Sequence, residues 1–231
     1  MSNVNIKRAV ENIRTGTNPY MPIVEVVVNA IQAIESLGVS DGIVDIEIIR
    51  SRQIEIELAS HIPEVQGFTI TDNGIGFNAE NREAFDTLYT DQKIMEGGKG
   101  FGRFTCLKYF KDVWIDSVYY DEDSYKSRKF KMGKETDIIV GESVSPTEAK
   151  KTRSTIKLIS PIKPFPDKNI SAIAKTLVEK LLPYFIDEDR KCPNIMLRET
   201  DNTDSVLLND YIYSSTEVSL KLYPIESRDH A

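Results

Sequence analysis

An acidic residue and an amide lie one helical turn apart near the start of the chain. Glu25 and Asn29 belong to "MPIVEVVVNAIQAIESL", in which apolar residues recur at helical spacing. Residues four apart on a helix project from the same face. A carboxylate there can activate a water molecule beside an amide that holds a metal ion. The same pair can instead form a structural hydrogen bond, and these two residues alone do not separate the alternatives.

A second candidate is "DNGIGF", which follows a strand-like segment at 67–71. Asp-Gly and Asn-Gly turns often close hairpins, so a simple turn is one interpretation of Asp72, Gly74 and Gly76. A polar excursion of about 20 residues precedes the next apolar strand, which disfavours a tight hairpin and indicates a functional loop. Two glycines separated by one residue allow the backbone to pass close to a flat ligand ring.

A third candidate is the glycine-rich "GGKGFGRF", which places Gly97, Gly100 and Gly102 before a segment expected to be helical. Such a turn can bind phosphate through free backbone N–H groups and the helix dipole, although many glycine loops are only flexible. Lys99 and Arg103 add the positive charge that phosphates favour. The sequence is not a Rossmann fingerprint, because no βαβ unit surrounds it, and it lacks the Gly-Lys-Ser/Thr of a Walker A loop.

Together these sequences resemble the GHKL ATPase superfamily, which includes gyrase B, the ninety-kilodalton heat-shock chaperones, histidine kinases and mismatch-repair ATPases. The shared order is Glu-x3-Asn on a helix, Asp-x-Gly-x-Gly after a strand and GxxGxG before a helix. The sequence "STIKL" (154–158) adds a fourth expected piece, a threonine on a late strand. The resemblance covers about residues 1–200 and implies the Bergerat ATP-binding fold with ATP or ADP and Mg²⁺ as ligands.

The resemblance implies roles in catalysis and phosphate binding. Glu25 corresponds to the general base that polarises the attacking water, and Asn29 corresponds to the Mg²⁺ ligand. Residues 78–100 are expected to form the ATP lid. The expected phosphate-binding residues are Lys99, Gly100, Phe101, Gly102 and Arg103, with Lys93 as a further lid candidate.

The resemblance also implies an adenine pocket. Asp72 is expected to accept a hydrogen bond from the exocyclic amine of adenine. Gly76 would let the backbone close over the ring, and Gly74 would keep the turn open. Thr155 is expected as a second anchor on the adenine side, reaching Asp72 directly or through water.

Glu25 also distinguishes between branches of the superfamily. Histidine kinases typically lack a carboxylate at that position and need an upstream helix with an acceptor histidine, whereas the first histidine here is His61. These features favour an ATP hydrolase, although Gln32 is more typical of kinases. The late helix and strand are similar to the end of the chaperone nucleotide domain. The glycine-rich sequence is most similar to uncharacterised bacterial GHKL proteins.

The hydrophobic pattern predicts an α+β, two-layer sandwich with a mixed, mostly antiparallel sheet and helices on one face. Helices are expected over 22–37 and 168–186, with helical character at 81–89 and 105–110. Strands are expected over 43–50, 54–58, 67–71, 113–120, 125–132, 136–143, 152–159 and 194–198, the first two as an antiparallel pair. The predicted organisation is an arm at 1–20, an ATP-binding domain at 21–200, and an extension or following domain at 201–231.

Composition limits the remaining possibilities. The formal net charge of −7 disfavours direct nucleic-acid binding by this domain, despite a basic stretch at 126–134. Cys106 and Cys192 form no zinc-ligand pattern and no disulfide framework, which suits a reducing compartment. The chain has no signal-peptide pattern and no apolar run near the ~20 residues needed to cross a membrane, so a cytoplasmic location without a membrane partner is expected.

The leading functional hypothesis is therefore an Mg²⁺-dependent ATPase domain that acts as a nucleotide-gated clamp and is slow in isolation. Such a domain is expected to form a nucleotide-dependent homodimer and to drive an effector domain C-terminal to it. One alternative is an ATP/ADP-binding switch without hydrolysis, or a histidine-kinase-like nucleotide module. Another is a structural interaction domain in which these sequences coincide by chance.

Overall fold

The computed structural model describes Glu11 and residues 18–51, 62–86, 102–187, 191–200 and 204–213. The helices are α2 (Met21–Leu37), α3 (Ala79–Asp86), α5 (Gly102–Tyr109), α6 (Ile170–Ile186) and α7 (Asp210–Tyr213). The strands are β1 (Ile43–Arg50), β2 (Val65–Asp72), β3 (Phe110–Asp121), β4 (Ser124–Met132), β5 (Ile139–Pro146), β6 (Arg153–Pro161), β7 (Asn194–Glu199) and β8 (Ser205–Leu207).

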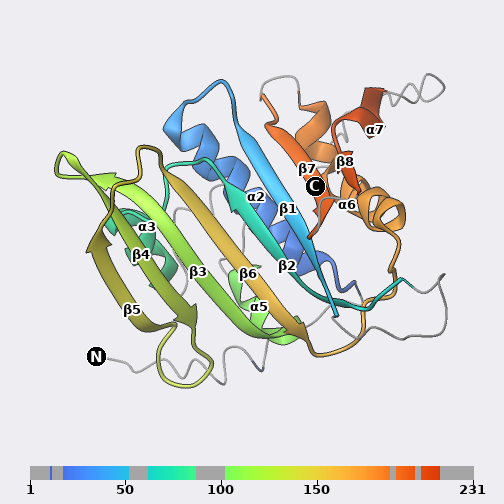
Figure 1. Ribbon diagram of the computed structural model, residues 1–231, viewed down its shortest axis with the longest axis horizontal. Helices are drawn as coiled ribbons and strands as arrows, with labels where there is room; N and C mark the ends of the chain where they lie inside the picture. Colours follow the sequence, from blue (N-terminus) through green and yellow to red (C-terminus); the bar gives the residue numbers. More distant parts are fainter. Residues whose placement is uncertain are drawn as a thin grey trace, which may run out of the picture.

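The strands form one open sheet in the order β5-β4-β3-β6-β2-β1-β7-β8 (Figure 1). Among the described residues, β1 and β7 form the one parallel pair, and the other neighbouring strands are antiparallel. Helices pack against this sheet, and α2 runs behind β1 and β2 in Figure 1. The predicted α+β class with a mixed, mostly antiparallel sheet is confirmed.

The pairing of β1 differs from the prediction. β1 pairs antiparallel with β2 on one side and parallel with β7 on the other. The antiparallel partner of β1 is therefore β2 and not the expected segment 54–58, which lies outside the described residues. Local alternation of apolar and acidic residues indicates a half-buried strand, but it does not specify which strand lies beside it.

Strands β3, β4 and β5 form an antiparallel meander, whereas β6 returns to the other side of β3 and pairs with both β3 and β2. This return places β6 next to the strand that ends at Asp72. The end of β2 is thus enclosed between β1 and β6 near the centre of the sheet.

The two faces of the sheet differ in burial. Along β3, Val113 and Ile115 are buried in the core shared with α2, α5 and α6. Trp114 and Tyr120 point to the opposite face and are 49% and 54% exposed, because side chains alternate along a strand. The face that carries Val113 is called the helix-covered face below, and the face that carries Trp114 is called the open face.

Helix α2 matches its predicted range closely. Pro22 stands in its first turn, where a missing N–H group costs nothing, and Gly38 ends it in a left-handed conformation with φ of 70°. The glycine-rich sequence leads into α5, which begins at Gly102 and ends at Tyr109, directly before β3. None of the described helices is both long and apolar enough to cross a membrane.

Candidate functional site

Asp72 is a buried carboxyl group at the end of β2. Its side chain is 3% exposed, and its Oδ1 accepts a hydrogen bond from the Gly74 N–H at 2.8 Å. The backbone N–H of Ser154 donates a second hydrogen bond to the carboxyl group. Burial nevertheless raises the pKa of Asp72 to about 7, because desolvation of the charged form outweighs these two hydrogen bonds. Asp72 therefore titrates near neutral pH.

The turn that follows Asp72 lies directly against α2. The Ile75 N–H donates to the Ala33 carbonyl oxygen at 3.0 Å. A Cβ atom at Gly74 would come within 2.6 Å of the Ala33 carbonyl carbon and 2.8 Å of the Ala33 Cβ. Only glycine permits this close approach of two backbones, so Gly74 fixes the distance between the turn and the helix.

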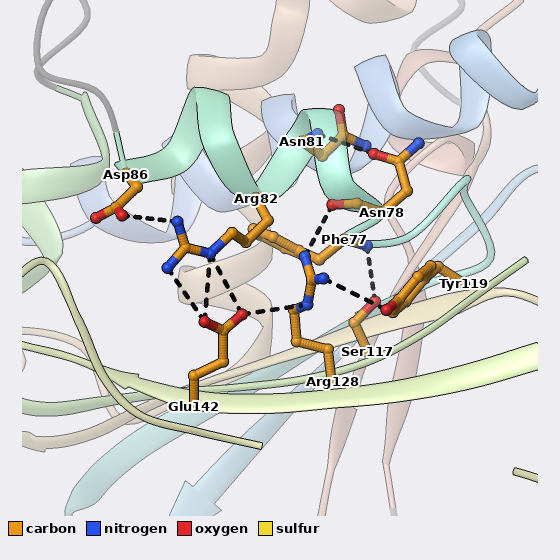
Figure 2. A network of polar contacts seen from close by, with 9 residues as sticks. All are labelled: Phe77, Asn78, Asn81, Arg82, Asp86, Ser117, Tyr119, Arg128 and Glu142. Carbon is orange, nitrogen blue, oxygen red and sulfur yellow. Dashed lines mark hydrogen bonds and ion pairs between the residues drawn. The ribbon is translucent and has the colours of Figure 1, made fainter. Parts of the chain in front are cut away.

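The next residues of the turn lie against β3. Gly76 has a φ of 81°, and a Cβ atom there would come within 2.5 Å of the Val118 carbonyl oxygen. The Phe77 N–H donates to Ser117 Oγ at 2.9 Å, a contact shown in Figure 2. The two glycines thus allow the turn to lie between a helix and a strand without side chains of its own in the gap.

The face of α2 that meets the turn also carries the predicted catalytic residues. Glu25, Asn29 and Ala33 follow one another at intervals of four, so they form one half-buried stripe along the helix. Ala33 contacts the turn after Asp72, whereas Glu25 lies near α5, where its charge acts on Arg103 and Cys106. The structure therefore brings the helix pair, the Asp72 turn and the start of α5 into one region.

Arg103 is the second residue of α5 and packs against Phe85, near the end of α3. It is 9% exposed, and its guanidinium lies over the rings of Phe104 at 4.8 Å and Phe85 at 5.3 Å. Desolvation lowers the pKa of Arg103 to about 10, while the charges of Asp86 and Glu25 raise it. The side chain is therefore cationic at neutral pH and lies within electrostatic range of Glu25.

The other predicted phosphate-binding residues are only partly described. Gly102 is the first residue of α5. Lys93, Lys99, Gly100 and Phe101 lie outside the described residues, as does most of the predicted lid. Their roles stay predictions.

The structure does not bring Thr155 to Asp72, which corrects the expected contact. Thr155 pairs with Thr71, and their Oγ1 atoms lie 3.0 Å apart. Thr155 also pairs with Asp116, two residues from Trp114, so it lies on the open face. The residue opposite Asp72 on the helix-covered face is Ser154. A register offset of one residue changes which hydroxyl stands on the side of the carboxyl group.

Ser154 and Ser117 form a buried hydroxyl pair that sequence reasoning missed. Their Oγ atoms are 3.2 Å apart. Ser117 Oγ donates to the Arg153 carbonyl oxygen at 2.9 Å and accepts from the Phe77 N–H. A serine has one hydroxyl proton, so Ser154 must be the donor within the pair. Ser117 within the apolar "VWIDSVYY" was the available signal, because a serine buried in a core strand requires partners.

Side chains that could bind a metal ion are sparse among the described residues. No group of three or more His, Cys, Asp or Glu side chains within the described ranges could hold a metal ion. Mg²⁺ in nucleotide sites commonly takes few protein oxygen ligands and completes its shell with phosphates and water. The amide of Asn29 can supply one such oxygen. No protein-family model matches the chain, and a search of curated proteins finds no match.

Proposed function

We propose that the protein binds ATP with Mg²⁺ and hydrolyses it, and that nucleotide binding drives a conformational clamp. One observation carries this proposal. The buried carboxyl of Asp72 leads into a turn that packs, through Gly74, on the helix stripe formed by Glu25, Asn29 and Ala33. The proposed base-reading group and the proposed hydrolytic pair would thus belong to one helix–turn unit, with Ala33 at the turn and Glu25 about two helical turns away.

Adenine recognition would depend on the ionised form of Asp72. Adenine presents an exocyclic amine that donates a hydrogen bond, whereas guanine presents a carbonyl oxygen at the equivalent position. A carboxylate accepts from the first and repels the second. Ser154 uses its proton for Ser117, so its oxygen is an additional acceptor on the same side as Asp72. This arrangement favours adenine nucleotides over guanine nucleotides.

Hydrolysis would use the opposite end of the helix stripe. Glu25 would accept a proton from the attacking water, and Asn29 would help to hold the Mg²⁺. The bound Mg²⁺ supplies positive charge to the β- and γ-phosphate oxygens. Arg103 is a buried cation near Glu25, so it can offset the negative charge of the phosphates on this side of the site.

The decisive experiment separates binding from turnover. Calorimetry with ADP should give similar affinity for wild type, Glu25→Gln and Glu25→Ala. Neither substitution touches the turn at 72–77 that is proposed to bind adenine, called the adenine turn below. ATP turnover should fall about 100-fold or more in both variants, the usual scale for loss of a general base. Glu35→Gln is the matched control, because Glu35 lies on the same helix but near its exposed end. Wild-type turnover in Glu25→Ala would overturn the base assignment.

Binding and turnover measurements also test the alternative functions. Tight ADP and ATP binding of the wild-type protein with no turnover would identify a nucleotide-binding switch. Transfer of the γ-phosphate to a histidine would instead identify a kinase-like module, for which Gln32 is the supporting residue. Absence of any nucleotide or Mg²⁺ effect on the melting temperature would overturn all three, because a ligand at 100 times its Kd adds about 2.7 kcal/mol of stability.

The clamp would require the N-terminal arm and an effector region. Lys108 Nζ of α5 donates to the Glu11 carbonyl oxygen at 2.9 Å, which supports contact between the arm and the helix that follows the glycine-rich sequence. Nucleotide could therefore influence the arm through α5, and two copies could associate. Sedimentation with and without a non-hydrolysable ATP analogue tests this association, and a monomer under both conditions contradicts it.

A further inference from the structure

Helix α3 begins directly after the adenine turn, and polar contacts join it to that turn. It has no buried residue of its own. The Asn78 side chain accepts a hydrogen bond from the Asn81 N–H at 2.8 Å, so Asn78 caps the helix. Asn81 Nδ2 in turn donates to the Gly76 carbonyl oxygen at 2.7 Å. The position of α3 and the conformation of the turn are therefore linked.

Arg128 of β4 holds this junction from below (Figure 2). Its side chain is buried, and Nη1 donates to the Asn78 carbonyl oxygen at 2.9 Å. Nη2 donates to the Tyr119 hydroxyl at 3.3 Å, and the guanidinium lies 4.9 Å from the centre of that ring. The guanidinium thus donates from two of its nitrogens and also lies against an aromatic ring, a combination that a lysine could not reproduce.

Glu142 of β5 connects Arg128 to α3 itself. Its Oε1 lies 3.3 Å from Arg128 Nε, and its Oε2 lies 3.1 Å from Arg82 Nη2. Arg82 also forms an ion pair with Asp86 at 2.7 Å within α3. One carboxylate therefore lies between two guanidinium groups, one on the sheet and one on the helix, as Figure 2 shows.

We propose that Arg128, Glu142 and Arg82 form a positioning cluster for the adenine turn. The cluster holds Asn78 and α3 against β4 and β5, and through Asn78 and Asn81 it fixes the backbone from Gly76 to Asn78. Loss of the Glu142 bridge would loosen this turn and speed nucleotide release. The inference rests on the proposed function for its effect on nucleotide, but its effect on α3 holds for the nucleotide-free protein.

The charge arrangement explains why Glu142 is the sensitive member. Neutralising Glu142 leaves the guanidinium groups of Arg82 and Arg128 without their shared counter-charge. Because Arg128 is buried, water cannot solvate its charge in place of the carboxylate. The Arg82 side of the bridge is partly exposed, so salt should also weaken it. Asp72 and Ser154 are not altered, so the preference for adenine over guanine should be unchanged.

The test compares Glu142→Gln with Glu148→Gln, which makes the same charge change at an exposed residue six positions later. In nucleotide-free protein, amide hydrogen exchange at Asn81 and Arg82 should become about tenfold faster in Glu142→Gln, because both amides bond to Asn78. Glu148→Gln should exchange like wild type. The off-rate of a fluorescent ADP analogue should rise about five- to tenfold in Glu142→Gln, with an unchanged ratio of ADP to GDP affinity.

The dependence of the ADP release rate on salt concentration distinguishes an ion-pair role of Glu142 from a role in packing alone. Raising the salt concentration should speed ADP release more in wild type than in Glu142→Gln, since the variant has already lost the screened ion pair. Arg128→Lys should release ADP faster, as Glu142→Gln does, because it cannot hold Asn78, Tyr119 and Glu142 together. If that variant does not fold, Glu142→Gln alone decides.

The outcomes separate this inference from the proposed function. Wild-type exchange at Asn81 and Arg82 in Glu142→Gln overturns the positioning cluster, whether or not the protein binds nucleotide. Faster exchange with an unchanged ADP off-rate also overturns it, because α3 would then move without affecting the turn. Failure of wild type to bind any nucleotide overturns the proposed function, and the exchange experiment still decides whether Glu142 positions α3.

Discussion

Asp72 and Ser154 lie directly opposite each other on β2 and β6, and both side chains project to the helix-covered face of the sheet. The backbone N–H of Ser154 donates to the Asp72 carboxyl group, while the Ser154 hydroxyl donates to Ser117. One residue thus orients the carboxyl group and continues the hydrogen bonds toward the turn at Phe77. Several consequences of this arrangement can be measured.

Ser154→Ala should weaken ADP binding more than Thr155→Ala does. The alanine keeps the backbone hydrogen bond to Asp72 but removes the hydroxyl on the side of the proposed base, a loss of about 1 kcal/mol or about fivefold in affinity. Thr155 lies on the open face beside Thr71, so Thr155→Ala should change the affinity less than twofold. Calorimetry on both variants checks this, and a larger loss for Thr155→Ala would contradict the register.

Nucleotide affinity should depend on pH through Asp72. Its pKa is raised to about 7 by burial, and the ionised carboxylate is a stronger acceptor for the adenine amine than the protonated carboxyl group. Below pH 7, the ADP affinity should fall with the ionised fraction, by at most about tenfold for each pH unit. Above pH 8 it should level off. Asp72→Asn should abolish the affinity gain at high pH, and an equal pH dependence in that variant would assign the titration to another group.

The stability of the nucleotide-free protein should change with pH in the opposite sense. Folding raises the pKa of Asp72 from 3.8 to about 7, so between these values the folded state binds more protons than the unfolded state. The free energy of unfolding contributed by this group therefore falls as pH rises, by at most about 1.4 kcal/mol per pH unit. Denaturant titrations of wild type and Asp72→Asn should show their difference declining up to pH 7 and then remaining constant.

Gly74→Ala should destabilise the protein and abolish nucleotide binding. The added Cβ would meet the Ala33 backbone at 2.6 Å, so the turn must move away from α2, at a cost of about 1–3 kcal/mol. Gly38→Ala is the comparison, because a Cβ there meets nothing within 4 Å and only the left-handed conformation is penalised. That variant should lose about 1 kcal/mol of stability but keep its ADP affinity. Thermal melting and calorimetry on both variants separate the two effects.

Much of the local structure could be predicted from the sequence. The apolar spacing of α2 and the alternation in β1 directly reflect the side-chain directions of a helix and a strand, so both elements lie within a residue of their predicted ranges. The sequence also predicted that Glu25 and Asn29 lie close together, because residues four apart project from the same face of a helix. The sequence "DNGIGF" also lies at the end of a strand, as predicted, because Asp72 is the last residue of β2.

The positions of these elements relative to one another could not be predicted in the same way. The alternating pattern of 43–50 indicated a strand but not its partners, which are β2 and the distant β7. Thr155 lies on a strand as expected, yet the register of β6 turned it to the open face and placed Ser154 opposite Asp72. A shift of one residue reverses every side chain of a strand, and the sum of packing contacts over the whole sheet selects the register.

The sequence by itself determined the types of the main elements, their order and the chemistry available in "VEVVVN", "DNGIGF" and the start of α5, because these depend on residues close together in the chain. The tertiary structure decided which groups meet: Asp72 with Ser154, Gly74 with Ala33, and Glu142 with Arg82 and Arg128. It also raised the pKa of Asp72 toward neutrality, since burial depends on what the rest of the chain places around a residue.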